Sequence, residues 1–316
     1  LRCPLSGYAS PMPTSTSELH VVNAHGMRLA ATFASPDLAS GKPAPAVLLC
    51  QGMSGVRTLV LPQAANALAA QGIATLRFDY AGFGDSEGDR GWIDPGARVE
   101  DARCALAALL ARDGVDPGRI GVYGHSLGGP VAIAVAAGDA RVRALAAVST
   151  PGAGREMLRA ARPAWQWVQL RHRVDAERAR IAAGEPAEMV GLDEILPFSP
   201  AFAAGYARLR QSDGGTSAKA AGTGLGVTDF YLASVDRITA SRPDLMAAGL
   251  AHCPALLVNG ADDDTAPIET VEPVFAAIPS TKRWIVVPSA DHNTLDADPG
   301  LSAALVQVSQ WFATHL

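Results

Sequence analysis

The chain has 316 residues, of which 48% are hydrophobic and 18% are charged, and its formal net charge at pH 7 is −5. This length can bury a large core, and it suits one large α/β domain or a domain with a sizeable insertion. The acidic balance and the lack of Lys/Arg runs argue against nucleic acid and anionic membrane surfaces as partners, and no stretch reaches the ~18–20 apolar residues of a membrane span.

The first residues are rich in Pro, Ser and Thr and lack the apolar run of a signal peptide. We expect residues 1–17 to be a disordered lead-in or an expression remnant. Cys3, Cys50, Cys104 and Cys253 are scattered without metal-ligand spacing, so we expect free thiols, no metal and no cofactor. Unpaired cysteines fit a reducing, cytoplasmic setting.

Short apolar runs alternate with helical stretches along the chain. Strands are predicted at residues 18–22, 27–33, 46–50, 73–78, 120–123, 142–148, 254–258 and 283–287. Helices are predicted at residues 58–71, 96–112, 131–137, 268–277 and 299–314. Strands and helices that alternate at this spacing form a mostly parallel sheet with helices on both faces. The sequence therefore predicts an α/β core made of residues 18–152 and 251–316.

Residues 153–250 interrupt this alternation, contain no clear buried strand, and are expected to form a helical cap insertion. They include a predicted helix over 163–183, with Pro in its first turn, and a Gly/Ser/Ala/Thr-rich stretch over 212–226 that forms a mobile lid or a loop. The aromatic side chains of the insertion either line a pocket or pack into a core of its own. Trp165 and Trp167 are two positions apart on one helix and cannot face the same way.

Residues 124–128 have the sequence Gly-His-Ser-Leu-Gly and lie between a predicted strand and a predicted helix. A strand, a G-x-S-x-G pentapeptide and a helix in this order predict a nucleophile elbow, a tight turn that exposes its serine. The glycines make room for the turn, and the backbone N–H groups at the start of the helix point outward. The pattern therefore nominates Ser126 as a nucleophile.

A serine hydroxyl needs a base within hydrogen-bond reach, and the base needs a carboxylate to orient it. On such a sheet the acid and then the histidine follow the serine, each in a loop after a strand. Of the seven histidines, His292 lies in such a loop, whereas His125 is expected to diverge from the serine and pack. The acid is one of three consecutive aspartates, Asp262, Asp263 and Asp264.

The elbow, the motif Gly260-x-x-Asp263 followed by Pro267, and Ala290-Asp-His292 together resemble an α/β-hydrolase of the serine esterase type. The similarity is greatest to dienelactone-hydrolase-like and prolyl-oligopeptidase-like esterases, and residues 78–88 resemble the D-x-x-G-x-G-x-S-x-G loop of that family. The resemblance covers residues 18–316 apart from the insertion. The resemblance implies the α/β-hydrolase fold and selects Asp263 as the acid of a triad with Ser126 and His292.

Two backbone N–H groups are expected to hold the oxyanion that forms on the substrate, those of Met53 and Leu127. Relatives of this kind usually carry His-Gly at the start of the loop that contains the first donor, whereas this chain has Gln51-Gly52. Because a backbone donor does not depend on its side chain, the first donor remains available. The nearby Gly82-x-Gly84 lacks the rest of a nucleotide-binding motif and is expected to serve a tight loop.

These residues predict a cytoplasmic serine hydrolase that cleaves a carboxylic ester, a lactone or a thioester of a small molecule through an acyl-enzyme. The alternative is an acyltransferase, a cyclase, a thioesterase or a hydrolase of carbon–carbon bonds. A non-catalytic, hydrolase-like binding protein is disfavoured because no triad member is missing from the sequence. A helical cap can form dimer contacts, so a homodimer is compatible with the sequence.

Overall fold

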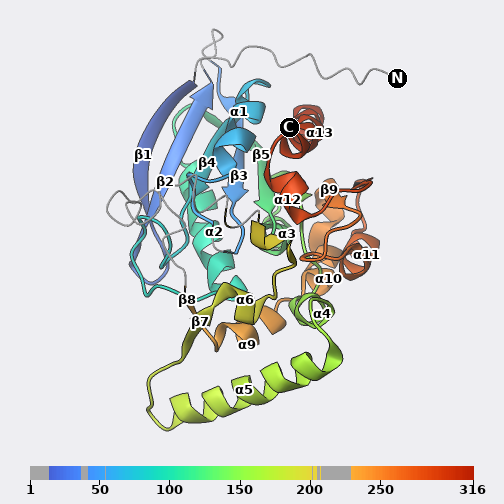
Figure 1. The fold of residues 1–316 in the computed structure, drawn as a ribbon. Helices are drawn as coiled ribbons and strands as arrows, with labels where there is room; N and C mark the ends of the chain where they lie inside the picture. Colours follow the sequence, from blue (N-terminus) through green and yellow to red (C-terminus); the bar gives the residue numbers. More distant parts are fainter. Residues whose placement is uncertain (1–13, 37–41, 54, 201, 205–206, 208–228) are drawn as a thin grey trace.

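The computed structural model describes residues 14–36, 42–53, 55–200, 202–204, 207 and 229–316 (Figure 1). Residues 1–13 of the predicted lead-in lie outside these ranges. The stretch 212–226, predicted as a lid or a loop, also lies outside them.

An eight-stranded sheet forms the centre of the fold, with the strands in the order β1-β2-β4-β3-β5-β6-β9-β10. The strands are β1 (Thr14–Val22), β2 (Arg28–Pro36), β3 (Ala44–Cys50), β4 (Ala74–Phe78), β5 (Val115–His125), β6 (Val142–Val148), β9 (Ala255–Gly260) and β10 (Lys282–Val287). β2 is antiparallel to both of its neighbours, whereas β4, β3, β5, β6, β9 and β10 pair in parallel. The predicted mostly parallel sheet is confirmed.

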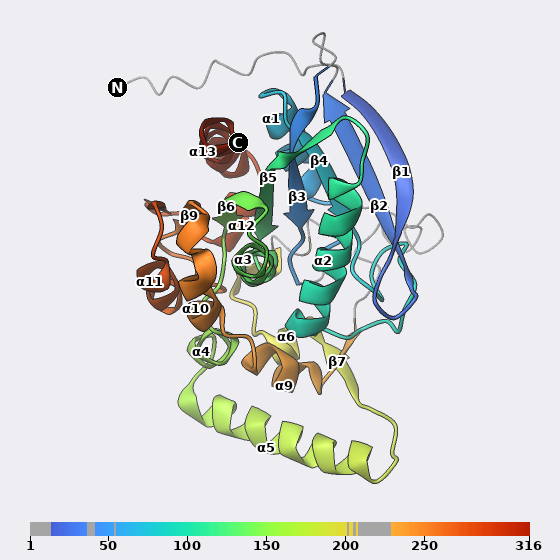
Figure 2. The ribbon, with the colours of Figure 1, turned by 180° about the vertical axis from the view of Figure 1, so that it is seen from behind.

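Helices cover both faces of the sheet (Figures 1 and 2). One face carries α2 (Pro95–Leu110), α3 (Gly128–Gly138) and α11 (Ile268–Ala277), and the other carries α1 (Leu61–Ala69), α12 (His292–Asp296) and α13 (Gly300–His315). The central strand β3 explains this arrangement, because Leu48 belongs to the core of one face while Val47 and Leu49 belong to the core of the other. A strand that is apolar on both sides needs helices on both sides.

β1 begins at Thr14, four residues earlier than predicted. It pairs with the end of β2, from Thr14 opposite Pro36 to Ser17 opposite Phe33. The sequence Thr-Ser-Thr-Ser has no apolar alternation, so the partner strand rather than a buried face makes it extended. The prediction that residues 14–17 belong to a disordered lead-in is therefore wrong.

The segment between β6 and β9 is mostly helical. It contains α4 (Gly154–Ala160), α5 (Ala164–Ala182), β7 (Met189–Gly191), α6 (Leu192–Ile195), β8 (Asp229–Tyr231), α9 (Ser234–Thr239), α10 (Pro243–Met246) and the 3₁₀ helix η2 (Ala247–His252). β7 and β8 pair antiparallel. The sequence predicts no strand there, because three residues are too few to carry a readable alternation.

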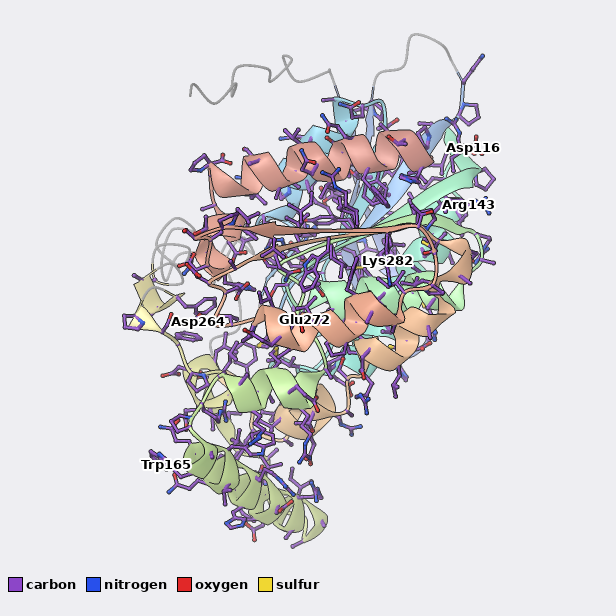
Figure 3. All side chains as sticks on the ribbon, turned by 90° about the vertical axis from the view of Figure 1, so that its right-hand side faces the viewer. Asp116, Arg143, Trp165, Asp264, Glu272 and Lys282 are labelled. Atoms are coloured by element: carbon purple, nitrogen blue, oxygen red, sulfur yellow. The ribbon has the colours of Figure 1, made fainter. Side chains whose placement is uncertain are left out.

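The two tryptophans of α5 face opposite ways, as their spacing predicts. Trp167 is 6% exposed and packs into the core, whereas Trp165 is 60% exposed and projects outward at the start of the helix (Figure 3). None of the helices in the described ranges combines the length and the apolar composition needed to cross a membrane.

The C-terminal helix α13 is anchored to the sheet by Phe312, which is fully buried and lies against Gly121 of β5. A Cβ atom built on Gly121 would lie 2.5 Å from the ring, so the glycine provides the space that the ring fills. We expect Phe312→Ala to lower the free energy of unfolding by about 3–5 kcal/mol, because it removes apolar contacts and leaves a cavity. Urea denaturation measures this change.

The matched control is Gln310→Ala, an exposed position on the same helix, for which a change within about 0.5 kcal/mol is expected. A loss below about 1 kcal/mol in Phe312→Ala would contradict the anchoring role of the ring.

Candidate active site

Ser126 lies in the tight turn between β5 and α3. Its φ of 51° is in the left-handed region, which costs free energy for a residue with a side chain. Three flanking glycines make the turn sterically possible. A Cβ atom on Gly124 would lie 2.6 Å from the Cα atom of Gly129, and one on Gly128 would lie 2.7 Å from the carbonyl oxygen of Gln51. The strained turn therefore depends on glycine at these positions.

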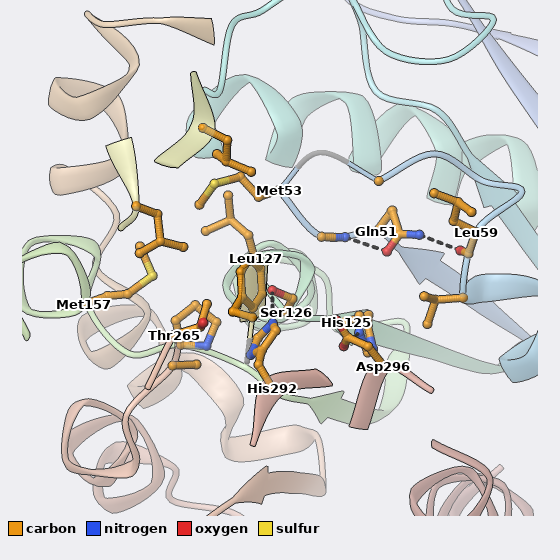
Figure 4. A pocket seen from close by; sticks show the side chains of 18 residues that line it. Gln51, Met53, Leu59, His125, Ser126, Leu127, Met157, Thr265, His292 and Asp296 are labelled. Carbon is orange, nitrogen blue, oxygen red and sulfur yellow. Dashed lines mark hydrogen bonds and ion pairs between the residues drawn. The ribbon is translucent and has the colours of Figure 1, made fainter. Parts of the chain in front are cut away.

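A chain of hydrogen bonds joins three loops of the sheet at this serine, and Figure 4 shows the part between Ser126 and His292. The Nε2 atom of His292 lies 3.0 Å from the Oγ atom of Ser126, and its Nδ1 atom lies 2.8 Å from the Oδ2 atom of Asp263. The histidine and the aspartate are each 3% exposed. The structure thus brings together the serine after β5, the acid after β9 and the histidine after β10, each at the carboxyl end of its strand.

Of the three consecutive aspartates, Asp263 is the one that faces the histidine. Its other carboxylate oxygen accepts hydrogen bonds from the backbone N–H groups of Thr265, at 3.0 Å, and Ala266, at 2.7 Å. Asp262 and Asp264 are exposed at the surface. Since both oxygens of Asp263 have donors, the carboxylate is held in one orientation toward the imidazole.

A further carboxylate, Asp296, lies at the edge of the same pocket, one helical turn after His292 on α12. Burial lowers the pKa of His292, but the negative charges of Asp263 and Asp296 outweigh it and raise this pKa to about 9. No motif in the sequence singles out Asp296. The i, i+4 spacing would have indicated it if the five-residue helix α12 had been predicted.

His125 turns away from the serine, as expected, but it does not merely pack. Its Nε2 atom lies 2.7 Å from the Oδ1 atom of Asp296, and its Nδ1 atom lies 3.2 Å from the hydroxyl of Tyr123. These contacts join β5 to α12 directly beneath the serine (Figure 4). They hold the carboxylate of Asp296 at a fixed place beside the pocket.

Gln51, which stands where relatives usually carry histidine, organises the loop after β3. Its side-chain amide donates to the carbonyl oxygens of Val56, at 3.1 Å, and Leu59, at 2.6 Å, and accepts from the N–H of Gly52 at 2.7 Å (Figure 4). A Cβ atom on Gly52 would lie 3.1 Å from the Cβ atom of Ser126, so the loop passes directly over the serine.

Both predicted oxyanion donors, Met53 and Leu127, border the pocket that contains Ser126. Within the described part of the chain, the backbone N–H of neither residue has a hydrogen-bond acceptor. An N–H group beside a pocket with no protein acceptor is available to a ligand.

The Gly-rich loop that contains Gly84 is tied to the rest of the fold through Asp79. The carboxylate of Asp79 accepts from the backbone N–H of Arg57 at 2.6 Å and pairs with its guanidinium. A side chain at Gly84, whose φ is +53°, would collide with this carboxylate. The contacts between Asp79 and Arg57 therefore hold the C-terminal end of the loop that begins at Gln51.

The pocket over Ser126 is lined mainly by apolar side chains, some from the core and some from the segment between β6 and β9. These apolar residues include Met53, Leu127, Met157, Leu192, Leu196 and Phe202. Asp296 contributes the one carboxylate among the described residues that line it. No cluster of three or more His, Cys, Asp or Glu side chains suited to a metal ion occurs within the described ranges.

Comparison with known proteins places this architecture among hydrolases. The family profile described as "Serine aminopeptidase, S33" matches residues 41–299. The structure of DcsB in complex with its substrate analogue has a TM-score of 0.80 at 20% identity, over 96% of this chain and 100% of that one. Dienelactone hydrolase from Anabaena variabilis has a TM-score of 0.55 at 18% identity, over 96% and 99%. At these identities the likeness establishes the fold.

The curated relatives fall into two groups, some matched at about 40% identity over a third of this chain and others matched at lower identity over most of it. An uncharacterized 31.7 kDa protein of Escherichia coli is 41% identical over 101 residues, which are 32% of this chain and 35% of that protein. Thiohydrolase aneE of Aspergillus aculeatus is 38% identical over 105 residues, 33% of each chain. Polyketide transferase ATR5 of Stachybotrys chlorohalonatus is 25% identical over 267 residues, 83% of this chain and 86% of that protein.

The matches to the first curated relatives cover only about a third of the length of those proteins, 33–35%. The family profile covers far more of the chain, and the fold agrees with it. The chain belongs to the serine aminopeptidase S33 family of α/β hydrolases.

Proposed function

We propose that this protein is a serine hydrolase that cleaves a carboxylic ester or thioester through an acyl-enzyme. The observation that carries the proposal is the hydrogen-bond chain from Ser126 through His292 to Asp263, with donor–acceptor distances of 3.0 and 2.8 Å. This arrangement supplies a nucleophile, a base and a group that orients the base.

In the proposed reaction, the Oγ atom of Ser126 attacks the carbonyl carbon while its proton passes to Nε2 of His292. The oxyanion is held by the backbone N–H groups of Met53 and Leu127. When the tetrahedral intermediate collapses, the leaving alcohol or thiol takes the proton from Nε2. A water molecule then repeats the same steps on the acyl-enzyme and releases the acid. Asp263 accepts the hydrogen bond from Nδ1 of His292 and keeps that proton in place.

The lining of the pocket supports an uncharged, apolar acyl group as the substrate portion held there. Met157, Leu192 and Phe202 come from the segment between β6 and β9, which we propose acts as a cap over the serine. Burial of apolar surface against these side chains favours an alkyl or aryl chain. An anionic acyl group would have to lie near Asp296 and lose its hydration, which disfavours its binding.

Acyl transfer to an acceptor other than water is the second candidate, because the relative matched over 83% of this chain is named a polyketide transferase. Both reactions share the acyl-enzyme and differ in the group that resolves it. Analysis of the products formed with an added alcohol, thiol or amine separates them: a new ester, thioester or amide indicates transfer.

The triad is tested by single substitutions assayed with p-nitrophenyl hexanoate. We expect Ser126→Ala and His292→Ala to lower kcat by about 10⁴-fold or more, and Asp263→Asn to lower it by about 10⁴-fold, because each removes a member of one catalytic unit. Asp264→Asn, at the exposed neighbouring position, is the matched control and should retain activity. Ser126→Ala with near-wild-type kcat would refute the proposal.

The pH profile tests the electrostatics around the base. Only neutral imidazole accepts a proton, and the pKa of His292 is raised to about 9, so kcat/KM should increase as pH rises from 6, reach half of its maximum near pH 9 and level off above that pH. Asp296→Asn removes one of the negative charges that raise this pKa, so the midpoint should move to lower pH. Asp116→Asn, at the opposite end of β5, is the control and should leave the midpoint unchanged. An unmoved midpoint in Asp296→Asn would contradict the role of that carboxylate.

Substrate preference tests the pocket. The kcat/KM for p-nitrophenyl hexanoate should exceed that for the p-nitrophenyl ester of a chain ending in a carboxylate by about 10-fold or more, since a buried unpaired charge costs over 1.4 kcal/mol. Equal rates for the two esters would show that the acyl chain does not enter this apolar pocket.

A further inference from the structure

Arg98 of α2 contacts the loop after β3 that carries Gly52 and Met53. Its guanidinium donates one hydrogen bond to the carbonyl oxygen of Gly52, at 3.0 Å, and another to the carbonyl oxygen of Met53, at 2.6 Å. Arg98 itself is 3% exposed and is not among the residues that line the pocket. One buried side chain thus holds two consecutive carbonyl groups of the loop.

The surroundings of this guanidinium are unusual for a charged group. It stacks between the rings of Tyr80 and Phe83, at 4.7 and 4.6 Å from their centroids, and forms no ion pair with a carboxylate in the described ranges. Burial lowers the pKa of Arg98 to about 10, which leaves the group charged at neutral pH. A buried cation without a carboxylate partner is costly for stability, so stability alone does not explain why an arginine stands here.

The geometry of the peptide bond connects Arg98 to the pocket. In a trans peptide the C=O and N–H groups point in opposite directions. Because the carbonyl of Gly52 points toward Arg98, the N–H of the next residue, Met53, points away from it. Met53 borders the pocket that contains Ser126 whereas Arg98 does not, so an N–H that points away from Arg98 is directed toward the pocket. The orientation of the first oxyanion donor is therefore set by where the Gly52 carbonyl is bound.

The same contact also affects the strength of the donor. Hydrogen bonds that share one peptide group polarise each other, and this effect is larger in a low-dielectric interior. A cationic donor on the Gly52 oxygen withdraws electron density from the peptide and makes the Met53 N–H a stronger donor. Negative charge that develops on the substrate oxygen would then be balanced through this peptide.

We propose that Arg98 is a positioning residue of the oxyanion hole, which orients and polarises the Gly52–Met53 peptide toward the substrate oxygen. This inference rests on the proposed serine hydrolase function. A lysine cannot replace the arginine fully, because its single ammonium group cannot hold two carbonyl oxygens in the fork geometry of a guanidinium.

The test compares Arg98→Met and Arg98→Lys with wild type on p-nitrophenyl hexanoate, with thermal unfolding measured for each. Arg112→Met is the matched control, because Arg112 also stacks on an aromatic ring, that of Phe33 at 4.7 Å, but lies away from the loop. We expect Arg98→Met to lower kcat by about 10²-fold, the typical effect of losing one oxyanion donor, with KM changed by less than about 3-fold. The lysine variant should lie between it and wild type, and the control should stay within about 2-fold of wild type.

A pair of inhibitors separates a positioning role from a structural one. A trifluoromethyl ketone with a hexyl chain forms an oxyanion when Ser126 adds to it, whereas the corresponding secondary alcohol only fills the pocket. Arg98→Met should weaken the binding of the ketone by about the same factor by which it lowers kcat. The affinity for the alcohol should stay unchanged. If Arg98→Met does not fold, the lysine variant is judged by the same ratio.

A folded Arg98→Met variant with kcat within about 3-fold of wild type would overturn the inference alone, as would equal weakening of the binding of the ketone and the alcohol. A wild-type protein that does not hydrolyse the ester, or an equally active Ser126→Ala, would overturn the proposed function itself. The two failures are therefore distinguishable.

Discussion

The hydrogen bond between the Oγ atom of Ser126 and the Nε2 atom of His292 is the contact on which the rest of the site depends. It joins the loop after β5 to the loop after β10, which are 166 residues apart in the sequence. The serine reaches this position only because the elbow adopts a positive φ, and the backbone at Gly124, Gly128 and Gly129 packs too closely there for any side chain. The strain in this turn is offset by the packing of α3 against the sheet.

Four side chains fix the loop opposite the serine. Gln51 organises the start of this loop, the Arg57–Asp79 pair fastens its end, and Arg98 holds its two central carbonyl groups. A stabiliser of developing charge is effective when its dipoles are already oriented before the reaction. The number of contacts made to one short loop is consistent with such preorganisation.

The core elements could be predicted from the sequence because buried parallel strands and their covering helices have regular apolar patterns. The location of the site could be predicted from the motifs around Ser126 and His292, because the loops that follow parallel strands lie at the same edge of the sheet. The choice among Asp262, Asp263 and Asp264 needed the family resemblance, because periodicity does not distinguish adjacent loop residues.

Other features had no readable signal. The first four residues of β1 are polar and are extended only because they pair with β2. The strands β7 and β8 have three residues each. Arg98 lies on the buried face of α2, although an arginine in a helix usually indicates the solvent side, and only its contacts with the carbonyl groups of Gly52 and Met53 single it out. Asp296 belongs to a five-residue helix that carries no periodic pattern. Each of these depends on contacts between segments distant in the sequence.

The central claim is that Ser126 is a nucleophile activated by His292. Incubation of the folded protein with a fluorophosphonate, followed by intact-mass measurement and peptide mapping, tests this claim most directly. The account predicts one adduct per chain, on Ser126, and slow or absent labelling of His292→Ala. No adduct on the folded wild-type protein, or an adduct on a different residue, would contradict it.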